Sequence, residues 1–222
     1  MALRARLRTA RLTLRPLVAS DQAALVGQAS DLEVSRWLTV VPYPYKARDF
    51  RAFLPRAHAG RVWVIADEAG FQGLIALESQ FGYWLGHTAW GRGYATEAAG
   101  AVLAAHFADP AARPVVSGYF LGNDRSARVL AKLGFVETGQ GMKHVLARKA
   151  DARHIDMLLT RDGFARANPL VIETARLRLA PLDADRDWEA LSRIGGRPEV
   201  ARMLMSVPSP WPETLVRDWI RH

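Results

Sequence analysis

The sequence predicts a mixed α/β fold in which a mostly antiparallel sheet is flanked by helices. Strand and helix patterns alternate along most of the 222 residues. Three short strand patterns follow one another at residues 61–66, 73–78 and 81–85, and turn residues join the first two, which predicts an antiparallel meander. Glycines then interrupt the pattern before a helix of small and apolar residues at 95–107.

The elements before the meander are a strand and short helices. Residues 11–17 alternate leucines with Arg and Thr, as a strand with one buried face does. A helix over 20–29 begins with Ser and Asp, which are favourable capping residues, and a second helix starts at Leu32. The prolines in segment 42–45 must end it, because each removes a donor and extends its predecessor. The remaining expected helices are 47–59 and 124–133, and the remaining strands are 115–120, 135–136 and 155–159.

The composition is that of an ordinary globular protein, with 50% hydrophobic and 23% charged residues. The chain is long enough to fold without disulfides or metal staples. It contains no cysteine, which excludes a disulfide scaffold, a Cys nucleophile and thiolate-bound metal centres. The longest apolar run, residues 98–108, is about half of the length that spans a bilayer. We therefore expect a soluble, cytoplasmic protein.

The net charge of +8 lies before residue 172, since residues 172–222 hold eight Arg against eight acids. Five of these charges come from an Arg-rich start: Arg4, Arg6, Arg8, Arg11 and Arg15. Such a start is typical of a transit peptide or of a phosphate-binding arm. The alternating leucines favour a strand, and the excess of 26 Arg over 4 Lys indicates a bias of the whole chain. We therefore do not expect nucleic acid as a partner.

A glycine-bearing loop, Trp-Gly-Arg-Gly-Tyr-Ala-Thr-Glu at residues 90–97, follows a strand and directly precedes a helix. Glycines let the backbone approach a ligand, and the amides and dipole of a helix start can hold an anion such as a pyrophosphate. The alternative is a simple tight turn. No Gly-Lys-Ser/Thr follows, and the third glycine of a dinucleotide fingerprint is absent.

A second motif, residues 123–135, reads Asn-Asp-Arg-Ser and ends in Lys-Leu-Gly-Phe. Together with the aromatic strand Tyr83-Trp84-Leu85, the glycine loop and the opening Thr-Ala-Arg-Leu pattern from Thr9, it resembles the GNAT superfamily of acyl-CoA-dependent N-acetyltransferases. It resembles in particular the branch that acetylates ribosomal-protein N-termini, over about residues 7–165. Trp90 stands where the wider superfamily often has Gln or Arg.

The resemblance implies an acetyl-CoA-dependent transfer by direct attack of an amine on the thioester, with acetyl-CoA as co-substrate. Strands 81–85 and 115–120 would splay apart, and the pantetheine arm would pair between them like an extra strand. A backbone N–H near Leu85 would stabilise the oxyanion. The implied cofactor-binding residues are Leu85, Trp90, Gly91, Arg92, Gly93, Tyr94, Ala95, Thr96 and Asn123.

The resemblance also implies Ser126, with Asn123, as the catalytic pair that protonates the leaving thiolate. The alternative is that Asn123 caps a helix and Ser126 lies in its first turn. Glu97 suits the helix dipole, and we interpret it as structural. The candidate bases are Glu78, His87 and Asp124, or a water molecule. The six histidines show no short pairing with acids that suggests a metal site, so we predict no metal.

The acceptor is expected to be a primary amine, either a protein N-terminus or a small molecule. In the resembling branch it is bound by the early helices and their loop, together with the last strands. Trp37, Tyr43 and Tyr45 are the implied substrate-binding residues, although aromatic residues are as often packing as pocket. The rival interpretation of the domain is a non-catalytic CoA-binding module that has kept the fold.

An internal repeat occupies the rest of the chain. Residues 174–182 repeat residues 9–17 at an offset of 165, with seven of nine positions identical. The sequence thus predicts an acetyltransferase domain at 1–168 and a partial second GNAT-like repeat at 169–222, which contains only the first strand and helices. Its apolar residues would lack a core, which favours docking, for example in a homodimer. The alternative is a truncated remnant of a tandem enzyme.

Overall fold

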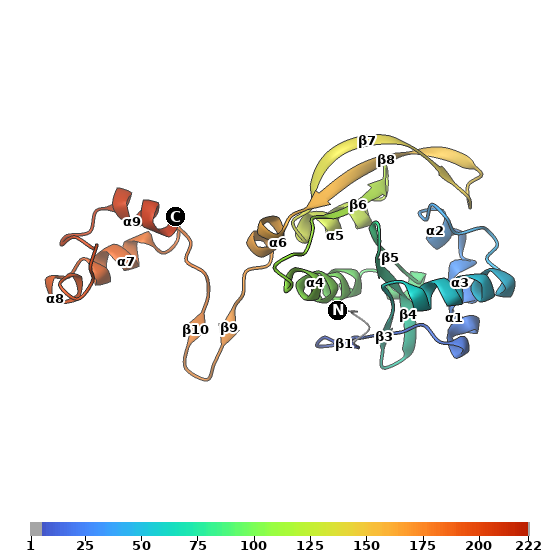
Figure 1. Ribbon diagram of the computed structural model, residues 1–222, viewed down its shortest axis with the longest axis horizontal. Coiled ribbons are helices and arrows are strands. Elements are labelled where there is room, and N and C mark those ends of the chain that lie inside the picture. Colours follow the sequence, from blue (N-terminus) through green and yellow to red (C-terminus); the bar gives the residue numbers. More distant parts are fainter. Residues whose placement is uncertain (1–5, 222) are drawn as a thin grey trace. The chain divides into compact units, whose positions relative to one another are not determined.

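The structure is a computed structural model that describes residues 6–221. It divides the chain into two compact units, Met1–Asn168 and Pro169–His222 (Figure 1). Arg4, one of the five arginines at the start of the sequence, lies outside the described residues. Within residues 6–221, no helix is long and apolar enough to cross a lipid bilayer.

The first unit contains a five-stranded sheet in which all neighbouring strands are antiparallel. In spatial and chain order its strands are β1 (Leu7–Arg8), β2 (Thr13–Arg15), β3 (Val62–Asp67), β4 (Gly70–Leu77) and β5 (Phe81–Leu85). The register pairs Leu7 with Leu14 and Leu14 with Ile65. The predicted meander is confirmed, and the described part of the Arg-rich start forms the edge hairpin β1–β2.

A second sheet holds three antiparallel strands in the order β6 (Val115–Phe120), β8 (Ala150–Leu159) and β7 (Val136–Val145). The predicted closing strands at 135–136 and 155–159 are wrong in extent, because they are only the ends of a hairpin with ten residues on each side. Figure 1 shows this hairpin as a long curved ribbon over β6. Nearly all of β7 is exposed, so its sequence lacks the apolar alternation that predicts strands.

The two sheets meet at β5 and β6, which share no backbone ladder in the described part of the chain. Near the start of both strands, Ser117 Oγ donates a 2.9 Å hydrogen bond to the Phe81 carbonyl oxygen. In a continuous sheet the two strands would pair along their whole length. Their separation leaves one edge of each strand unpaired, as the expected splaying of these strands requires.

Helices cover both faces of the five-stranded sheet. The helices of the first unit are α1 (Gln22–Ala29), α2 (Leu32–Ser35), α3 (Ala47–Ala59), α4 (Tyr94–Phe107), α5 (Asp124–Lys132) and α6 (Arg161–Ala167). Trp63 and Ile65 of β3 pack in the core that includes α4 and α5, whereas Val62 and Val64 pack in a second core with α1 and α3. This alternation follows from the twofold period of a strand.

The predicted helices of the first unit are confirmed, with small shifts at their ends. The helix expected at 20–29 begins with a short 3₁₀ turn, Ala19–Asp21, before α1. The short helix α6 was not predicted. Its N-cap residue is Thr160, whose Oγ1 accepts a 3.0 Å hydrogen bond from the Gly163 amide.

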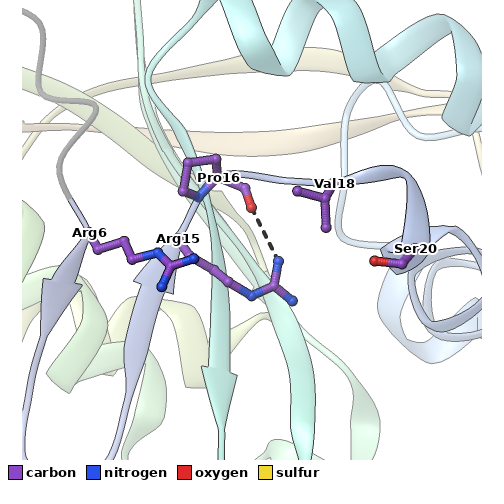
Figure 2. A pocket seen from close by; sticks show the side chains of 5 residues that line it. All are labelled: Arg6, Arg15, Pro16, Val18 and Ser20. Carbon is purple, nitrogen blue, oxygen red and sulfur yellow. Dashed lines mark hydrogen bonds between the residues drawn. The ribbon is translucent and has the colours of Figure 1, made fainter.

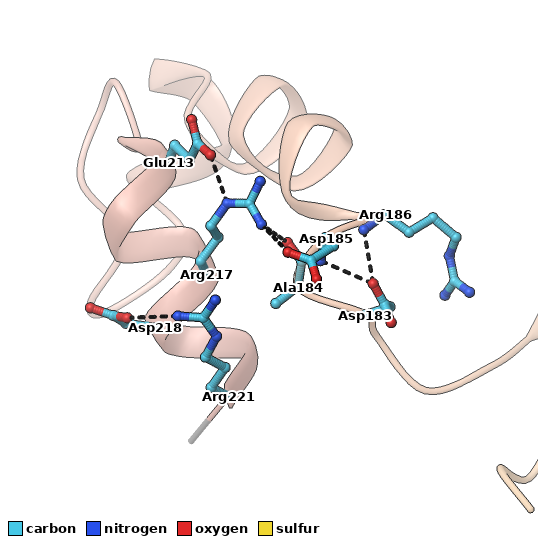
Figure 3. Close-up of polar contacts among 8 residues, drawn as sticks. All are labelled: Asp183, Ala184, Asp185, Arg186, Glu213, Arg217, Asp218 and Arg221. Atoms are coloured by element: carbon cyan, nitrogen blue, oxygen red, sulfur yellow. Dashed lines mark hydrogen bonds and ion pairs between the residues drawn. The ribbon is translucent and has the colours of Figure 1, made fainter. Parts of the chain in front are cut away.

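The second unit consists of a hairpin and three helices. Its elements are β9 (Ile172–Glu173), β10 (Arg178–Leu179), α7 (Trp188–Gly195), α8 (Pro198–Ala201) and α9 (Glu213–Arg221). A small core forms around Trp211, which is buried and lies edge-on to Trp219. Figure 3 shows Arg217 of α9 bonded to Glu213 and to Asp185, which fixes α9 to the segment before α7.

The opening turns of the two units have the same hydrogen bonds. The Thr9 amide donates to the Leu12 carbonyl while Thr9 Oγ1 accepts from the Leu12 amide, and the same two bonds join Thr174 and Leu177. Helices α7, α8 and α9 begin 166 residues after α1, α2 and α3. The burial differs, because Leu14 is fully buried whereas the equivalent Leu179 is 53% exposed.

Candidate active site

The loop between β5 and α4 forms an uncapped helix start. Gly91 and Gly93 have φ angles of 75° and 78°, which favour glycine because a Cβ is strained there. Gly93 is the N-cap residue of α4, and it supplies no side-chain cap. Tyr94, Ala95 and Thr96 form the first turn, whose amides have no intrahelical acceptor. The free amides and the helix dipole together can hold an anion.

Arg92 and Tyr94 are both tied to Asp67 at the end of β3. Tyr94 Oη donates a 2.9 Å hydrogen bond to Asp67 Oδ2, and Arg92 Nη1 lies 3.4 Å from the same oxygen. Burial raises the pKa of Asp67, but hydrogen bonds from Tyr94, Gln72 and the Ala69 amide, with the Arg92 charge, lower it overall. Tyr94 therefore anchors the loop, and the half-exposed Arg92 keeps a cation beside it.

Glu97 in the first turn of α4 holds the turn between β1 and β2. Its carboxylate accepts hydrogen bonds from Thr9 Oγ1 at 2.5 Å and from the Arg11 amide and Nε at 2.9 and 2.8 Å. These contacts agree with the structural role expected for Glu97. They also bring Arg11 to the loop, where its Nη2 would lie 3.3 Å from a Cβ on Gly93. The sequence did not indicate Arg11 as a second cation at this loop, because Arg11 and its partner Glu97 are 86 residues apart.

The unpaired edge of β5 presents backbone groups next to the loop. The Gly86 amide donates to the Gln72 carbonyl across the β4–β5 ladder, and antiparallel strands alternate the direction of their amides. The Leu85 N–H therefore points away from β4, toward the gap beside β6. Trp90 Nε1 donates a 2.9 Å hydrogen bond to the Leu85 carbonyl, which fixes the glycine loop to the end of β5. The Arg125 guanidinium lies over the Trp90 ring, 4.4 Å from its centroid.

Asn123 and Ser126 lie at the start of α5, and Ser126 contacts the aromatic strand. Asn123 Oδ1 accepts a 3.3 Å hydrogen bond from the Ser126 amide, which is the capping geometry. Ser126 Oγ lies 3.1 Å from Tyr83 Oη of β5. Burial raises the pKa of Tyr83 to about 12, so the phenol is neutral near pH 7. Ser126 therefore has a hydroxyl partner, which its sequence motif did not predict.

The three candidate bases are spread around the fold. Glu78 follows β4, with its carboxylate against Gly60 at the opposite end of β5 from Leu85. His87 Nδ1 lies 3.5 Å from Asp31 Oδ2, and the His87 side chain is 60% exposed. Asp124 is the exposed first residue of α5. The structure brings none of the three into contact with Ser126.

The three predicted substrate-binding aromatic residues have different surroundings. Trp37 lies beside the turn before Asn123, since a Cβ on Gly122 would be 3.9 Å from Trp37 Cη2. Tyr43 is exposed. Tyr45 is buried in the core with α1 and α3, and burial raises its pKa to about 12. That position favours the packing alternative for Tyr45, because an acceptor would have to displace core residues to reach it.

Arg148, in the turn between β7 and β8, lies next to Trp37. Its guanidinium is 4.5 Å from the centroid of the Trp37 ring and 5.6 Å from that of Phe120. Its Nε donates to the Arg36 carbonyl at 2.5 Å, while Nη2 is buried and has no partner among the described residues. Burial and the Arg36 charge lower the pKa of Arg148. An unpaired buried donor is unfavourable, so an acceptor oxygen would be stabilising there.

Two histidines contact carboxylates on the β7–β8 hairpin. His154 Nδ1 lies 2.9 Å from Asp156 Oδ1, and His144 Nδ1 lies 2.9 Å from Asp151 Oδ1. His154 and Asp156 are two residues apart on β8, which places both on one face of the strand. The signal was missed because β8 was predicted to begin only at residue 155. Within residues 6–221, no group of three His, Cys, Asp or Glu could hold a metal ion.

A surface pocket of about 420 Å³ lies outside the predicted site. Figure 2 shows its lining residues, Arg6, Arg15, Pro16, Val18 and Ser20. Arg15 is not available to a ligand as a free cation, because it makes a bidentate ion pair with Asp21 at 2.8 and 2.7 Å. We therefore interpret this pocket as a depression in the protein surface between β2 and the start of α1, and not as a ligand site.

Comparison with known proteins identifies the fold and the family. The acetyltransferase (GNAT) domain family matches residues 11–136. Similar solved structures include the spermidine N-acetyltransferase from Vibrio cholerae in complex with CoA and spermine, which is 16% identical with a TM-score of 0.60 over 70% of this chain and 99% of the other. The ribosomal-protein-S5-alanine acetyltransferase from Vibrio fischeri is 19% identical, with a TM-score of 0.58 over 72% and 98%. RimJ of Mycobacterium smegmatis in complex with CoA-disulfide is 21% identical, with a TM-score of 0.57 over 73% and 93%.

These structures share the fold of the first unit at low sequence identity. No curated protein matches the chain. The family match spans more than half of the chain and includes the β5 edge, the glycine loop and the start of α5. The chain therefore belongs to the acetyltransferase (GNAT) family.

Proposed function

We propose that this protein is an acetyl-CoA-dependent N-acetyltransferase that moves an acetyl group to a primary amine by direct attack on the thioester. One observation carries the proposal: the unpaired edge of β5, with the Leu85 N–H facing the gap, leads directly into the uncapped start of α4. This arrangement places three features one after another along the chain. They are a strand edge that can pair with a ligand, a backbone donor for the oxyanion and a helix start that can bind an anion. Direct attack needs no Cys nucleophile, and the chain has none.

The residues at the loop fit the pyrophosphate of acetyl-CoA. The amides from Gly91 to Thr96 are the donors. The half-exposed guanidinium groups of Arg92 and Arg11 lie beside them, although Asp67 and Glu97 partly offset their charges. Trp90 fixes the loop to Leu85 rather than projecting freely. Asn123 retains an unused amide group in addition to its capping oxygen, and we assign that group to a cofactor contact.

Ser126 is our candidate for the group that donates to the leaving thiolate, and Tyr83 supports this role. A serine hydroxyl alone is a weak acid. Either hydroxyl can be the donor in the contact of Tyr83 with Ser126, and when the phenol donates to Ser126 Oγ, the serine proton is directed away from Tyr83. The helix dipole at the start of α5 also favours negative charge there. The pair thus stabilises a developing thiolate by hydrogen bonding.

The acceptor site is proposed to lie beside Trp37, where the early helices meet the β7–β8 hairpin. The Leu146 amide donates a 3.2 Å hydrogen bond to the Thr39 carbonyl, which joins the two segments. The unpaired Nη2 of Arg148 could bind a carbonyl oxygen, whereas a polyamine would bring a second cation toward Arg148 and Arg36. We therefore favour a protein or peptide N-terminus over polyamines as the acceptor.

Release of free CoA from acetyl-CoA, measured with a panel of peptides, polyamines, amino acids and aminoglycosides, tests the proposal. A non-catalytic CoA-binding module would be stabilised by CoA yet release none with any amine. We expect release with N-terminal peptides at a higher kcat/KM than with spermidine. A higher kcat/KM for spermidine would overturn the acceptor assignment but not the activity.

For residues 169–222 we propose a partial second domain of the same kind. The supporting observations are the matched hydrogen bonds of the Thr9 and Thr174 turns and the constant offset of the helices. We further propose that its exposed apolar residues dock on a second copy and form a homodimer. The rival is an inert remnant, and the oligomeric state of a truncated chain distinguishes the two.

A further inference from the structure

We propose that His154, oriented by Asp156, is the base that takes a proton from the acceptor amine. The proposal rests on the proposed N-acetyltransferase function and names a base other than the sequence candidates Glu78, His87 and Asp124. It is carried by the position of His154, by the direction of its free nitrogen and by the charges around it.

His154 lies on the acceptor side of β6 and β8. Ile155, Met157 and Leu159 of β8 pack in the core that also contains Leu130 of α5, so His154 and Asp156 point to the opposite face. On that face the His154 ring contacts Phe120 edge-on, with centroids 5.2 Å apart. Ser126, on α5, and His154 thus lie on opposite sides of the strand that borders the gap.

The same face carries the proposed acceptor site. Phe120 is also the ring over which the Arg148 guanidinium lies, and Arg148 packs on Trp37. The Phe120 carbonyl accepts a hydrogen bond from the Asn123 amide, in the turn that leads to Ser126. Trp37 and His154 are thus linked through Arg148 and Phe120, and we place the amine between them.

The free nitrogen of His154 points at the β6 edge strand. The Nδ1 contact with the Asp156 carboxylate requires a proton on Nδ1, so Nε2 carries the lone pair. A Cβ on Gly118 would clash with the His154 ring and lie 2.8 Å from Nε2. Gly118 is thus the residue that leaves room for the ring over β6. Within residues 6–221, Nε2 has no hydrogen-bond partner.

Charged groups around His154 keep it neutral and able to accept a proton. Burial lowers its pKa, the Lys143 charge lowers it further, and Asp156 partly opposes both. Lys143 Nζ lies 3.3 Å from Asp156 Oδ1, which helps to keep that carboxylate ionised. Gly118 and Phe120, the contacts from β6, do not titrate, and Arg148 beyond Phe120 adds a further cation.

The proton balance of the reaction requires such a group. An alkylammonium must lose one proton before its nitrogen can attack, and it loses a second after the C–N bond forms. The first passes to His154 Nε2 and then to solvent. The C–S bond breaks, and the second proton ends on the leaving sulfur, beside Ser126. The products are the N-acetyl amine and free CoA, with one proton released.

The test is the pH profile of His154→Asn in the full-length chain. At pH 7 we expect kcat to fall about 100-fold, the lower part of the range for a lost general base. Because the free amine needs no base, log kcat of the variant should rise with pH at a slope of about 1 and approach the parent near the pKa of the amine, roughly 8 for an α-amino group. A merely structural role would lower activity equally at all pH values.

His144→Asn is the matched control, since His144 makes the same 2.9 Å contact with an acid on the same hairpin but is 56% exposed. It should leave kcat and its pH profile unchanged. His154→Asn with more than half of the parent kcat, or with the parent's pH profile, would overturn the proposal. A parent protein that releases no CoA with any amine would instead refute the function itself.

Lys143→Met keeps the proposal falsifiable if His154→Asn does not fold. Lys143 is on the exposed strand β7, and its charge lowers the pKa of His154. Removing the charge should therefore raise that pKa and move the acidic limb of kcat/KM to higher pH. An unmoved acidic limb would show that His154 is not the titrating base.

Discussion

Replacing Tyr83 by Phe removes one hydroxyl and keeps the ring, so it isolates the contact with Ser126. That contact is a single hydrogen bond of 3.1 Å between neutral groups. Such a bond contributes about 1 kcal/mol, which corresponds to roughly a fivefold change in rate if it acts in the transition state. We expect kcat to fall about fivefold in Tyr83→Phe while the Kd for CoA stays within twofold.

Ser126→Ala and the double variant complete a double-mutant cycle with Tyr83→Phe. The serine acts chiefly on the leaving sulfur, so its loss should lower kcat about tenfold or more and weaken CoA binding much less. If Tyr83 acts only through Ser126, the double variant should have the kcat of Ser126→Ala alone. The assay is thiol release at saturating acetyl-CoA, with CoA binding measured separately by calorimetry.

The control is Tyr119→Phe, which removes the hydroxyl of a partly buried tyrosine that donates to Glu137 at 3.0 Å. It should leave kcat unchanged. If kcat of the double variant falls by the product of the two single losses, the two hydroxyls act independently. A Ser126→Ala variant with the parent rate would return Ser126 to a purely helical role and refute the reasoning.

Three further predictions concern the loop, the fold and the second unit. Gly93→Val should abolish the rise in melting temperature that CoA causes, because Gly93 has φ of 78° and a side chain would approach Arg11; an unchanged rise in a folded variant would remove the loop from the site. Burial raises the pKa of Asp21, but hydrogen bonds from Arg15 and the Val18 amide lower it overall. The ionised carboxylate therefore stabilises the folded state above the pKa that Asp has in the unfolded chain, near 4, and this stabilisation is lost as the pH falls. Asp21→Asn should thus lower the unfolding free energy by about 2 kcal/mol at pH 7 and by much less at pH 3 in urea titrations, and an equal loss at both would contradict the ion-pair account. Deleting residues 169–222 should leave a folded monomer that binds CoA, and a truncated chain that sediments as the full-length dimer would show that the second unit does not hold the assembly together.

Elements with strong local signals could be predicted from sequence almost residue by residue. The helix α3 and the strands β5 and β6 begin and end where their patterns predicted. For α3 the reason is visible, because the Asp49 carboxylate accepts from the Lys46 amide and closes the first turn. Gly91 and Gly93 were also identifiable, since positive φ angles demand glycine.

Contacts between distant segments could not be predicted in the same way. Arg11 reaches the glycine loop through Glu97, and Tyr83 reaches Ser126 across the gap between the sheets. The greater part of the hairpin β7–β8 was missed, because nearly all of β7 is exposed and lacks apolar alternation. His154 and Asp156 were missed with it, because their spacing of two residues places them together only on a strand.

The two copies of the opening pattern separate what nine residues determine from what the fold adds. Both form a Thr-based turn with the same hydrogen bonds and the same strand register, so this local geometry is encoded within the repeat. In the first unit Leu14 pairs with Ile65 of β3 and is fully buried, because β3 and α4 cover it. In the second unit Leu177 and Leu179 are 62% and 53% exposed, although the strand around them has formed. The exposed edge therefore already has the geometry that accepts an apolar strand like β3, and the docking proposed for residues 169–222 requires no refolding of that edge.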